Sequence, residues 1–369
     1  MESIIKDVKV INPDSTINNA DVIIENNFIK EIIPKSGEGS MLLIPGFIDT
    51  HIHGMGNYDV MEGAKALQNI STQLSRYGTT SFMPTLMTNS WETIIKSLKE
   101  IAHNEFWVSR NLGFHIEGPF IGNDKKGAHK QEFLLKATKQ RIKQLAVESE
   151  YNLKKISFDP SMMSIKNFKF MQEELHIIGS IGHSSASYAL AEEFFKNGCT
   201  LVCHLWNAMS GVDSRNPGIA QAALYHDDVY TELIIDFVHS SKETILFTIK
   251  NKTPDKIIAV SDAIKPAYYE DGENISGGVP VFKKGKLITL LNTNTIAGSG
   301  IMIYDAFVNL VKIGISLNDA VKMTSYNAAK HLGHCKLGKI EKNFLADFII
   351  MNPKNYKIKS VYIDGRRIK

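Results

Sequence analysis

Two histidines stand one residue apart in the stretch IPGFIDTHIHGMG, residues 44–56. Because alternate side chains of a β-strand point to the same face, Asp49, His51 and His53 would lie side by side. Imidazole is a common ligand of divalent transition metals, so the two histidines can form part of a metal site. Taken alone, the motif is equally compatible with hydrogen-bonded histidines in a protein core.

Three further side chains of the ligand type end other apolar runs. Glu117 ends HIE, His183 follows SIG, and His204 follows LVC. A carboxylate and two imidazoles suit Zn²⁺ or another divalent transition metal, with one coordination position left for water. Three unrelated buried polar groups would each lose hydration without a shared function. The metal interpretation is therefore preferred for these residues.

Other polar residues follow the same kind of run. Asp262, in AVSDA, could accept a proton from water activated by a metal, or cap a helix. The loop GPFIGNDKKGAHK carries His129, and the loop NAMSGVDSRNPG carries Asn207, Ala208 and Arg215. An imidazole, backbone amides and a guanidinium group can bind a phosphorylated or carboxylated substrate, although both segments also read as ordinary surface loops.

Eight short apolar runs carry these residues, and amphipathic segments such as 91–106 and 187–198 separate them. This alternation predicts parallel strands joined by helices, and polar residues at the strand ends are typical of a TIM (β/α)8 barrel of the α/β class. Gly198 is expected to end its helix. The runs span residues 47–53, 80–85, 112–120, 156–160, 177–184, 200–207, 232–239 and 257–263.

The two ends of the chain differ from its middle. Residues 1–45 and 340–369 alternate β-branched and polar side chains, which predicts a small β-sandwich domain formed by the N- and C-terminal segments. The barrel domain is then expected over residues 46–339. Residues 277–300 are expected to form an inserted hairpin ahead of a last helix.

Composition restricts the functional classes. A chain of 369 residues with 43% hydrophobic residues can bury a large core, and a net charge of +3 without a basic cluster predicts no nucleic-acid partner. A small-molecule substrate is expected instead. Three cysteines form no disulfide framework, so we expect a cytoplasmic protein. No run approaches the roughly 18 apolar residues of a membrane span, so no membrane partner is expected.

Several motifs occur in a characteristic order, namely PGFIDTHIHG, GFHIEGPF, KGAH, GHSSA, HLWNAM, RNPG, VSDA and IAGS. Together they resemble the N-acetylglucosamine-6-phosphate deacetylase family of the amidohydrolase superfamily, over nearly the whole chain. The resemblance implies hydrolysis of N-acetyl-D-glucosamine 6-phosphate to D-glucosamine 6-phosphate and acetate in amino-sugar metabolism. It also implies a homodimer with one or two divalent metal ions per subunit. Zn is the expected metal, and Fe, Co or Mn are the alternatives.

The resemblance also implies a role for each matching residue. It assigns Glu117, His183 and His204 as the principal metal ligands, His51 and His53 as a pair that can hold another ion, and Asp262 as the acid/base. In the substrate site it assigns Ala128 and His129 to the sugar, and Asn207, Ala208 and Arg215 to the phosphate. It also assigns Asp236 and His239 to a substrate segment, and Ile296, Ala297 and Gly298 to the acetamido group.

Two departures from the family pattern concern the substrate site. Phe237 and Val238 stand where the family has Gly first, and FDPS, with Asp159 and Ser161, replaces a usual Ala-Pro-Glu. Two rival functions each have a sequence feature that distinguishes them. Cyclic amidases such as dihydroorotases use a carboxylated lysine on strand four, and ISFDP contains none. A non-catalytic sugar-phosphate-binding scaffold would be favoured by loss of ligands, and every ligand is present.

Overall fold

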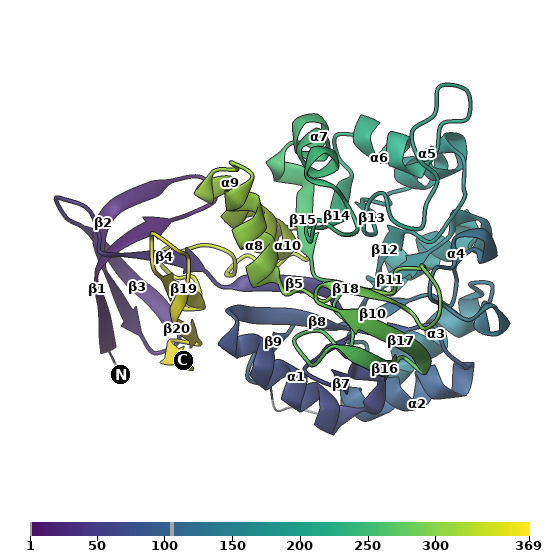
Figure 1. The fold of residues 1–369 in the computed structure, drawn as a ribbon, viewed down its shortest axis with the longest axis horizontal. Helices are drawn as coiled ribbons and strands as arrows, with labels where there is room; N and C mark the ends of the chain where they lie inside the picture. Colours follow the sequence, from purple (N-terminus) through teal and green to yellow (C-terminus); the bar gives the residue numbers. More distant parts are fainter. Residues whose placement is uncertain (1, 104–106) are drawn as a thin grey trace.

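A parallel barrel forms the larger part of the computed structural model, which describes residues 2–103 and 107–369 (Figure 1). Within these ranges its path contains eight strands, each overlapping one predicted run. A backbone bridge from Ile52 to Ala263 joins the first strand to the segment after the last. The strands are β5 (Phe47–Ile52), β8 (Thr79–Met87), β10 (Phe114–Glu117), β11 (Leu153–Phe158), β12 (Ile178–Ile181), β13 (Leu201–Val202), β14 (Tyr230–Ile234) and β15 (Ile257–Val260).

Helices follow the strands and pack on the outside of the barrel, as the βα repeat predicts. Serine side chains begin several of them: Ser90 accepts from the amide of Thr93 at 3.2 Å, and Ser241 from that of Thr244 at 3.2 Å. The main helices are α1 (Ala64–Arg76), α2 (Trp91–Ala102), α3 (Lys139–Glu148), α4 (Ile165–Lys169), α5 (Tyr188–Lys196), α6 (Ile219–Tyr225), α7 (Lys242–Lys252), α8 (Ile303–Lys312), α9 (Leu317–Val321) and α10 (Asn327–His331).

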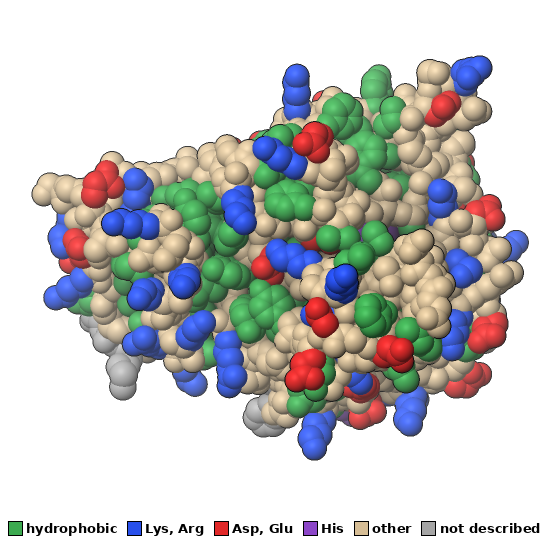
Figure 2. Space-filling view, in the orientation of Figure 1, with side chains coloured by type: hydrophobic (Ala, Val, Ile, Leu, Met, Phe, Trp, Pro, Cys, Tyr) green, Lys and Arg blue, Asp and Glu red, His purple; other side chains and the backbone are tan. Residues whose placement is uncertain are grey.

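Two expectations about these helices can be compared with the structure. The helix expected over 91–106 is α2, which ends at Ala102; residues 104–106 lie outside the described ranges. Gly198, which follows the C-cap residue Asn197 of α5, has a φ of 96°, the left-handed conformation that a glycine after a helix provides. In the described part of the chain, no helix is long and apolar enough to cross a membrane. On the face drawn in Figure 2, Lys and Arg side chains are spread over the surface with Asp and Glu among them.

The terminal segments share one mixed sheet beside the barrel, with strand order β21-β20-β19-β4-β1-β2-β3. An antiparallel bridge also joins Phe28, at the start of β3, to Leu345, just before β19, and the expected small β-sandwich encloses a core that includes Val10, Val22 and Phe348. Its strands are β1 (Glu2–Ile11), β2 (Thr16–Glu25), β3 (Phe28–Pro34), β4 (Met41–Pro45), β19 (Phe348–Met351), β20 (Ile358–Ile363) and β21 (Arg366–Arg367).

The segment inserted after β15 is larger than the hairpin that the sequence predicts. It is a three-stranded antiparallel sheet of β16 (Gly272–Ser276), β17 (Val279–Lys284) and β18 (Leu287–Leu290). Residues 277–300 contain the expected hairpin, formed by β17 and β18, and β16 adds a third strand that pairs with β17 across the turn at Gly277 and Gly278. Three helices, α8, α9 and α10, follow in place of one last helix.

Candidate metal centre and substrate cavity

Six side chains named from the sequence converge at the carboxyl ends of the barrel strands. All six are buried, and each is at or just beyond the end of its own strand. They are His51 and His53 at β5, Glu117 at β10, His183 after β12, His204 after β13, and Asp262 after β15.

The first group consists of Glu117, His183 and His204. Oε1 of Glu117 lies 3.1 Å from Nε2 of His183 and 3.0 Å from Nε2 of His204, and the two nitrogens are 3.2 Å apart. Ligands bound at about 2.0–2.1 Å around a tetrahedral ion lie about 3.3–3.4 Å from one another. The spacing and the donor types of this group therefore fit a divalent transition-metal ion.

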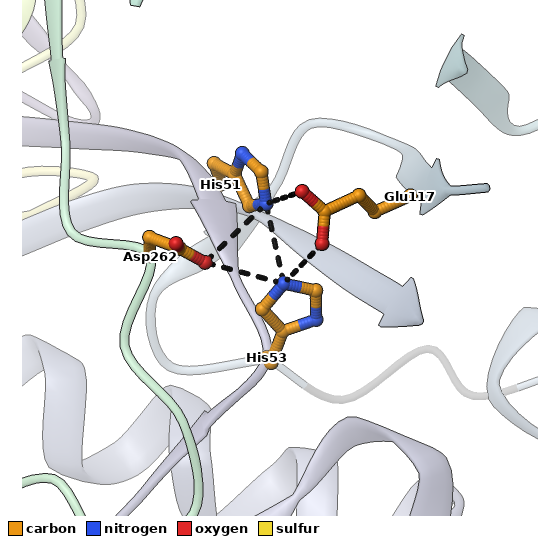
Figure 3. Close-up of side chains that lie close together, drawn as sticks. All are labelled: His51, His53, Glu117 and Asp262. Atoms are coloured by element: carbon orange, nitrogen blue, oxygen red, sulfur yellow. Dashed lines mark hydrogen bonds and ion pairs between the residues drawn. The ribbon is translucent and has the colours of Figure 1, made fainter. Parts of the chain in front are cut away.

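The second group contains His51, His53, Glu117 and Asp262 (Figure 3). Nε2 of His53 lies 3.2 Å from Nε2 of His51, 3.2 Å from Oε2 of Glu117 and 3.3 Å from Oδ1 of Asp262. Nε2 of His51 lies 3.5 Å from Oδ1 of Asp262. These donors also have the spacing of a tetrahedral site. Oε1 of Glu117 faces the first group and also lies 3.4 Å from Nε2 of His51, while Oε2 faces His53, so this carboxylate can serve two ions.

Carbonyl groups behind two of the histidines orient their rings. Nδ1 of His183 lies 2.9 Å from the carbonyl oxygen of Lys125, and Nδ1 of His53 lies 3.1 Å from that of Thr85. Because a carbonyl oxygen only accepts, each Nδ1 carries a proton, and Nε2 is the ring atom that faces the site. This is the usual arrangement of metal-binding histidines.

Electrostatics keeps the carboxylates of the site ionised. Burial disfavours the charged form of Asp262, but the field of His51 and the contact with His53 outweigh it and lower the pKa. Burial acts the same way on Glu117, and His51 and His183 nevertheless hold its pKa well below its usual value. Burial lowers the pKa of His129 to about 4, so that imidazole is neutral at pH 7. Ionised carboxylates are the form in which these groups bind metal ions.

Several of the six side chains are carried on unusual backbone conformations. The φ angles of His183, His204 and Asp262 are 47°, 21° and 50°, in the left-handed region that non-glycine residues seldom adopt. Each such residue costs about 1–3 kcal/mol, and such conformations concentrate at functional sites. No local pattern in the sequence indicates them.

A cavity of about 340 Å³ opens beside the ligands. Oδ2 of Asp236 lies 2.7 Å from Nδ1 of His239 and so orients that ring at the cavity wall. Arg215 is exposed in its loop and is not among the described residues that line the cavity. Of the other substrate residues named from the sequence, Ala128, His129, Asn207, Ala208, His239, Ile296, Ala297 and Gly298 line it.

The sequence reasoning missed part of the cavity wall. The inserted sheet contributes Ser276, Val279 and Val281, while Met87 and Ile264 add apolar surface. The alternation of valines at 279 and 281 was the available signal, because every second strand residue faces the same side.

The structure also explains the two departures from the family pattern. Phe237 has a φ of 64°, a conformation that glycine adopts most easily, and the residue is 39% exposed. Oδ1 of Asp159 accepts from the amide of Ser161 at 2.7 Å and begins a short 3-10 helix. Asp159 and Ser161 therefore have a local structural role, at the start of this helix.

The fourth strand of the barrel does contain a lysine, contrary to the expectation from ISFDP. Strand β11, the fourth of the barrel, begins at Leu153 and includes Lys155, whose side chain is buried inside the barrel. Its ammonium group forms an ion pair with Glu232 and donates to the carbonyl of Thr50 at 2.8 Å. Lys155 is therefore engaged away from the two ligand groups.

Comparison with known proteins gives consistent matches over almost the full length. A sequence model of the amidohydrolase family matches residues 42–368. The chain is 31% identical over 368 residues to the N-acetylglucosamine-6-phosphate deacetylase of Lysinibacillus sphaericus, covering 95% of this chain and 93% of the relative. The corresponding values for the enzyme of the same name from Bacillus subtilis (strain 168) are 30% over 369 residues, 95% and 93%.

A solved structure also matches the whole fold. The crystal structure of N-acetylglucosamine-6-phosphate deacetylase from Thermotoga maritima superposes with a TM-score of 0.91 at 28% identity, covering 100% of this chain and 99% of that chain. The barrel and the terminal sheet are therefore both shared with that protein.

Proposed function

The chain belongs to the amidohydrolase family, and from this premise we propose that it is a metal-dependent deacetylase. Its substrate is N-acetyl-D-glucosamine 6-phosphate, and its products are D-glucosamine 6-phosphate and acetate, as the names of the relatives at 30–31% identity indicate. The observation that carries the proposal is the convergence of Glu117, His183 and His204 with Asp262 beside the cavity.

The cofactor is a divalent cation held by Glu117, His183 and His204, and Zn²⁺ suits this donor set best, with Fe, Co and Mn as alternatives. When bound, it supplies water of lowered pKa and polarises the amide carbonyl. His51, His53 and Asp262 provide for a second ion, bound more weakly.

Asp262 is the proton-transfer group of the reaction. Its amide donates to the carbonyl of His51 at 2.9 Å, and this contact fixes the carboxylate between the ligand groups and the cavity. Ionised at neutral pH, it accepts a proton from the attacking water. It then returns this proton to the amine nitrogen as the C–N bond of the tetrahedral intermediate breaks.

Other residues bind and orient the substrate. Nε2 of His129 lies 3.4 Å from Oε2 of Glu117, so the neutral imidazole lies beside this proposed metal ligand. From there it can donate a hydrogen bond to the acetamido oxygen of the substrate. His239, held by Asp236, is placed to contact the sugar. Ile296, Ala297 and Gly298 surround the acetamido methyl group.

The phosphate end is assigned to Asn207, Ala208 and Arg215. Lys125 is the one Lys or Arg among the described residues that line the cavity. A dianionic phosphate bound there therefore has few cationic partners within the cavity itself. Arg215, on the exposed loop, supplies a further charge. We also propose that the protein is a homodimer, in which the neighbouring subunit contributes to the phosphate end of the site. Its proposed location is cytoplasmic.

The decisive experiment measures acetate release. Purified protein is incubated with N-acetylglucosamine 6-phosphate, or with unphosphorylated N-acetylglucosamine as the control, with and without a chelator. Release from the phosphorylated sugar alone, abolished by the chelator and restored by Zn²⁺, is the expected result. Binding without hydrolysis in the presence of metal would favour a sugar-phosphate-binding scaffold, and hydrolysis of dihydroorotate instead would favour a cyclic amidase.

A further inference from the structure

A buried ion pair lies inside the barrel, apart from the ligands assigned above. Lys155 on β11 is 1% exposed and Glu232 on β14 is 0% exposed, and their charged groups are in direct contact. Thr50 joins both partners, since its hydroxyl donates to Oε1 of Glu232 at 3.2 Å and its carbonyl accepts from Lys155 at 2.8 Å. Burying two charges costs several kcal/mol per ion before their attraction is counted, so a hydrophobic pair would be the simpler choice for packing alone.

The second oxygen of Glu232 points toward the candidate metal centre. Within the described residues Oε2 is buried and has no hydrogen bond of ordinary length, and it lies 3.5 Å from Nδ1 of His51. Nε2 of the same ring lies 3.2 Å from Nε2 of His53 and 3.4 Å from Oε1 of Glu117. The His51 ring therefore lies between the carboxylate of Glu232 and the other members of the second group.

We propose that Glu232 and Lys155 are positioning residues that make His51 a metal ligand. An acceptor at Nδ1 holds the proton on that nitrogen and leaves the lone pair of Nε2 directed at the ion. Lys155 and Thr50 engage Oε1, so that Oε2 is the oxygen available to His51. Because Thr50 directly precedes His51, its contacts also hold the ion pair in register with the strand that carries the ligand.

The charge of this acceptor distinguishes His51 from two other ligands. His53 and His183 have neutral carbonyl oxygens at Nδ1, whereas His51 has a carboxylate. A carboxylate makes the imidazole a stronger electron donor to the metal. Cys203 is the competing acceptor, with Sγ 3.7 Å from Nδ1 of His51, but a thiol accepts weakly.

The proposal rests on the metal centre of the proposed function and predicts a selective change in metal affinity. Metal-free protein is titrated with Zn²⁺ in competition with a chromophoric chelator, so no substrate is required. Glu232→Gln should weaken the second, His51-containing site by about 10–100-fold and leave the Glu117, His183 and His204 site unchanged. Excess Zn²⁺ should restore the second ion to the variant.

Two further variants separate positioning from folding. Cys203→Ala should retain the affinity of both sites, and Glu232→Asp, which keeps the charge, should lose less affinity than Glu232→Gln. Circular dichroism and thermal unfolding of the metal-free proteins detect any general loss of structure, and Glu232→Asp carries the test if Glu232→Gln does not fold.

Three results would overturn the proposal: unchanged affinity at both sites in Glu232→Gln, equal weakening of both sites, or weakening caused by Cys203→Ala. If Glu232→Asp carries the test, unchanged affinity at its second site has the same meaning. A wild-type protein that binds two ions but releases no acetate would contradict the proposed function and leave this inference standing.

Discussion

Substitution of His53 by Gln tests whether the two ligand groups hold separate ions. Nε2 of His53 lies 3.2–3.3 Å from donor atoms of His51, Glu117 and Asp262, all members of the second group. The first group keeps its three ligands when His53 is lost. We therefore expect the metal content to fall from about two ions per chain toward about one, with measurable deacetylation remaining.

Glu117→Gln provides the contrasting perturbation, because the two oxygens of Glu117 serve the two groups. Oε1 lies 3.0 Å from His204, and Oε2 lies 3.2 Å from His53, so replacing the carboxylate weakens both ions together. We expect activity at ordinary metal concentrations to fall by more than about 10³-fold, equivalent to about 4 kcal/mol of transition-state stabilisation. Glu192→Gln is the matched control, since Glu192 forms a surface ion pair with Lys196.

The assay combines metal analysis by mass spectrometry, after gel filtration, with acetate release. If His53→Gln is as inactive as Glu117→Gln, His53 belongs to the essential site and the separation into two groups is wrong. If the wild type binds a single ion even in excess metal, His51 and His53 shape the cavity without completing a second site.

Three other substitutions test the acid/base, the phosphate end and the core. Asp262→Asn preserves the shape but removes the base, so turnover should fall by roughly 10²–10⁴ while the ion of the first group is retained; near-normal turnover at neutral pH would exclude the role. Arg215→Ala should raise KM for the phosphorylated sugar far more than for the unphosphorylated one, by a contact worth about 1.5–3 kcal/mol, and equal effects would remove Arg215 from the phosphate site. Phe307 is fully buried with its ring centroid 5.5 Å from that of Phe47, so Phe307→Ala should lower the free energy of unfolding by about 3–5 kcal/mol in urea titrations, and an unchanged midpoint would contradict this.

The sequence by itself predicted the order of the barrel strands and which polar side chains converge at their carboxyl ends. Apolar runs and helical spacing are local patterns, because burial repeats every second residue in a strand and about every 3.6 residues in a helix. Polar residues that end such runs, as Glu117 and His204 do, must meet at one rim once the strands are parallel. The same rule predicted that His51 and His53, which are separated by one residue, face the barrel interior from β5.

Only the tertiary structure decided which distant groups are in contact. Lys155 and Glu232 are 77 positions apart, and no local pattern in the sequence indicates that they pair or that Glu232 lies beside His51. The left-handed backbone of His183 and the third strand of the inserted sheet were likewise absent from the expectations. Closure of the barrel creates these contacts, since it brings side chains from separate strands into one dry interior where each buried charge needs a partner.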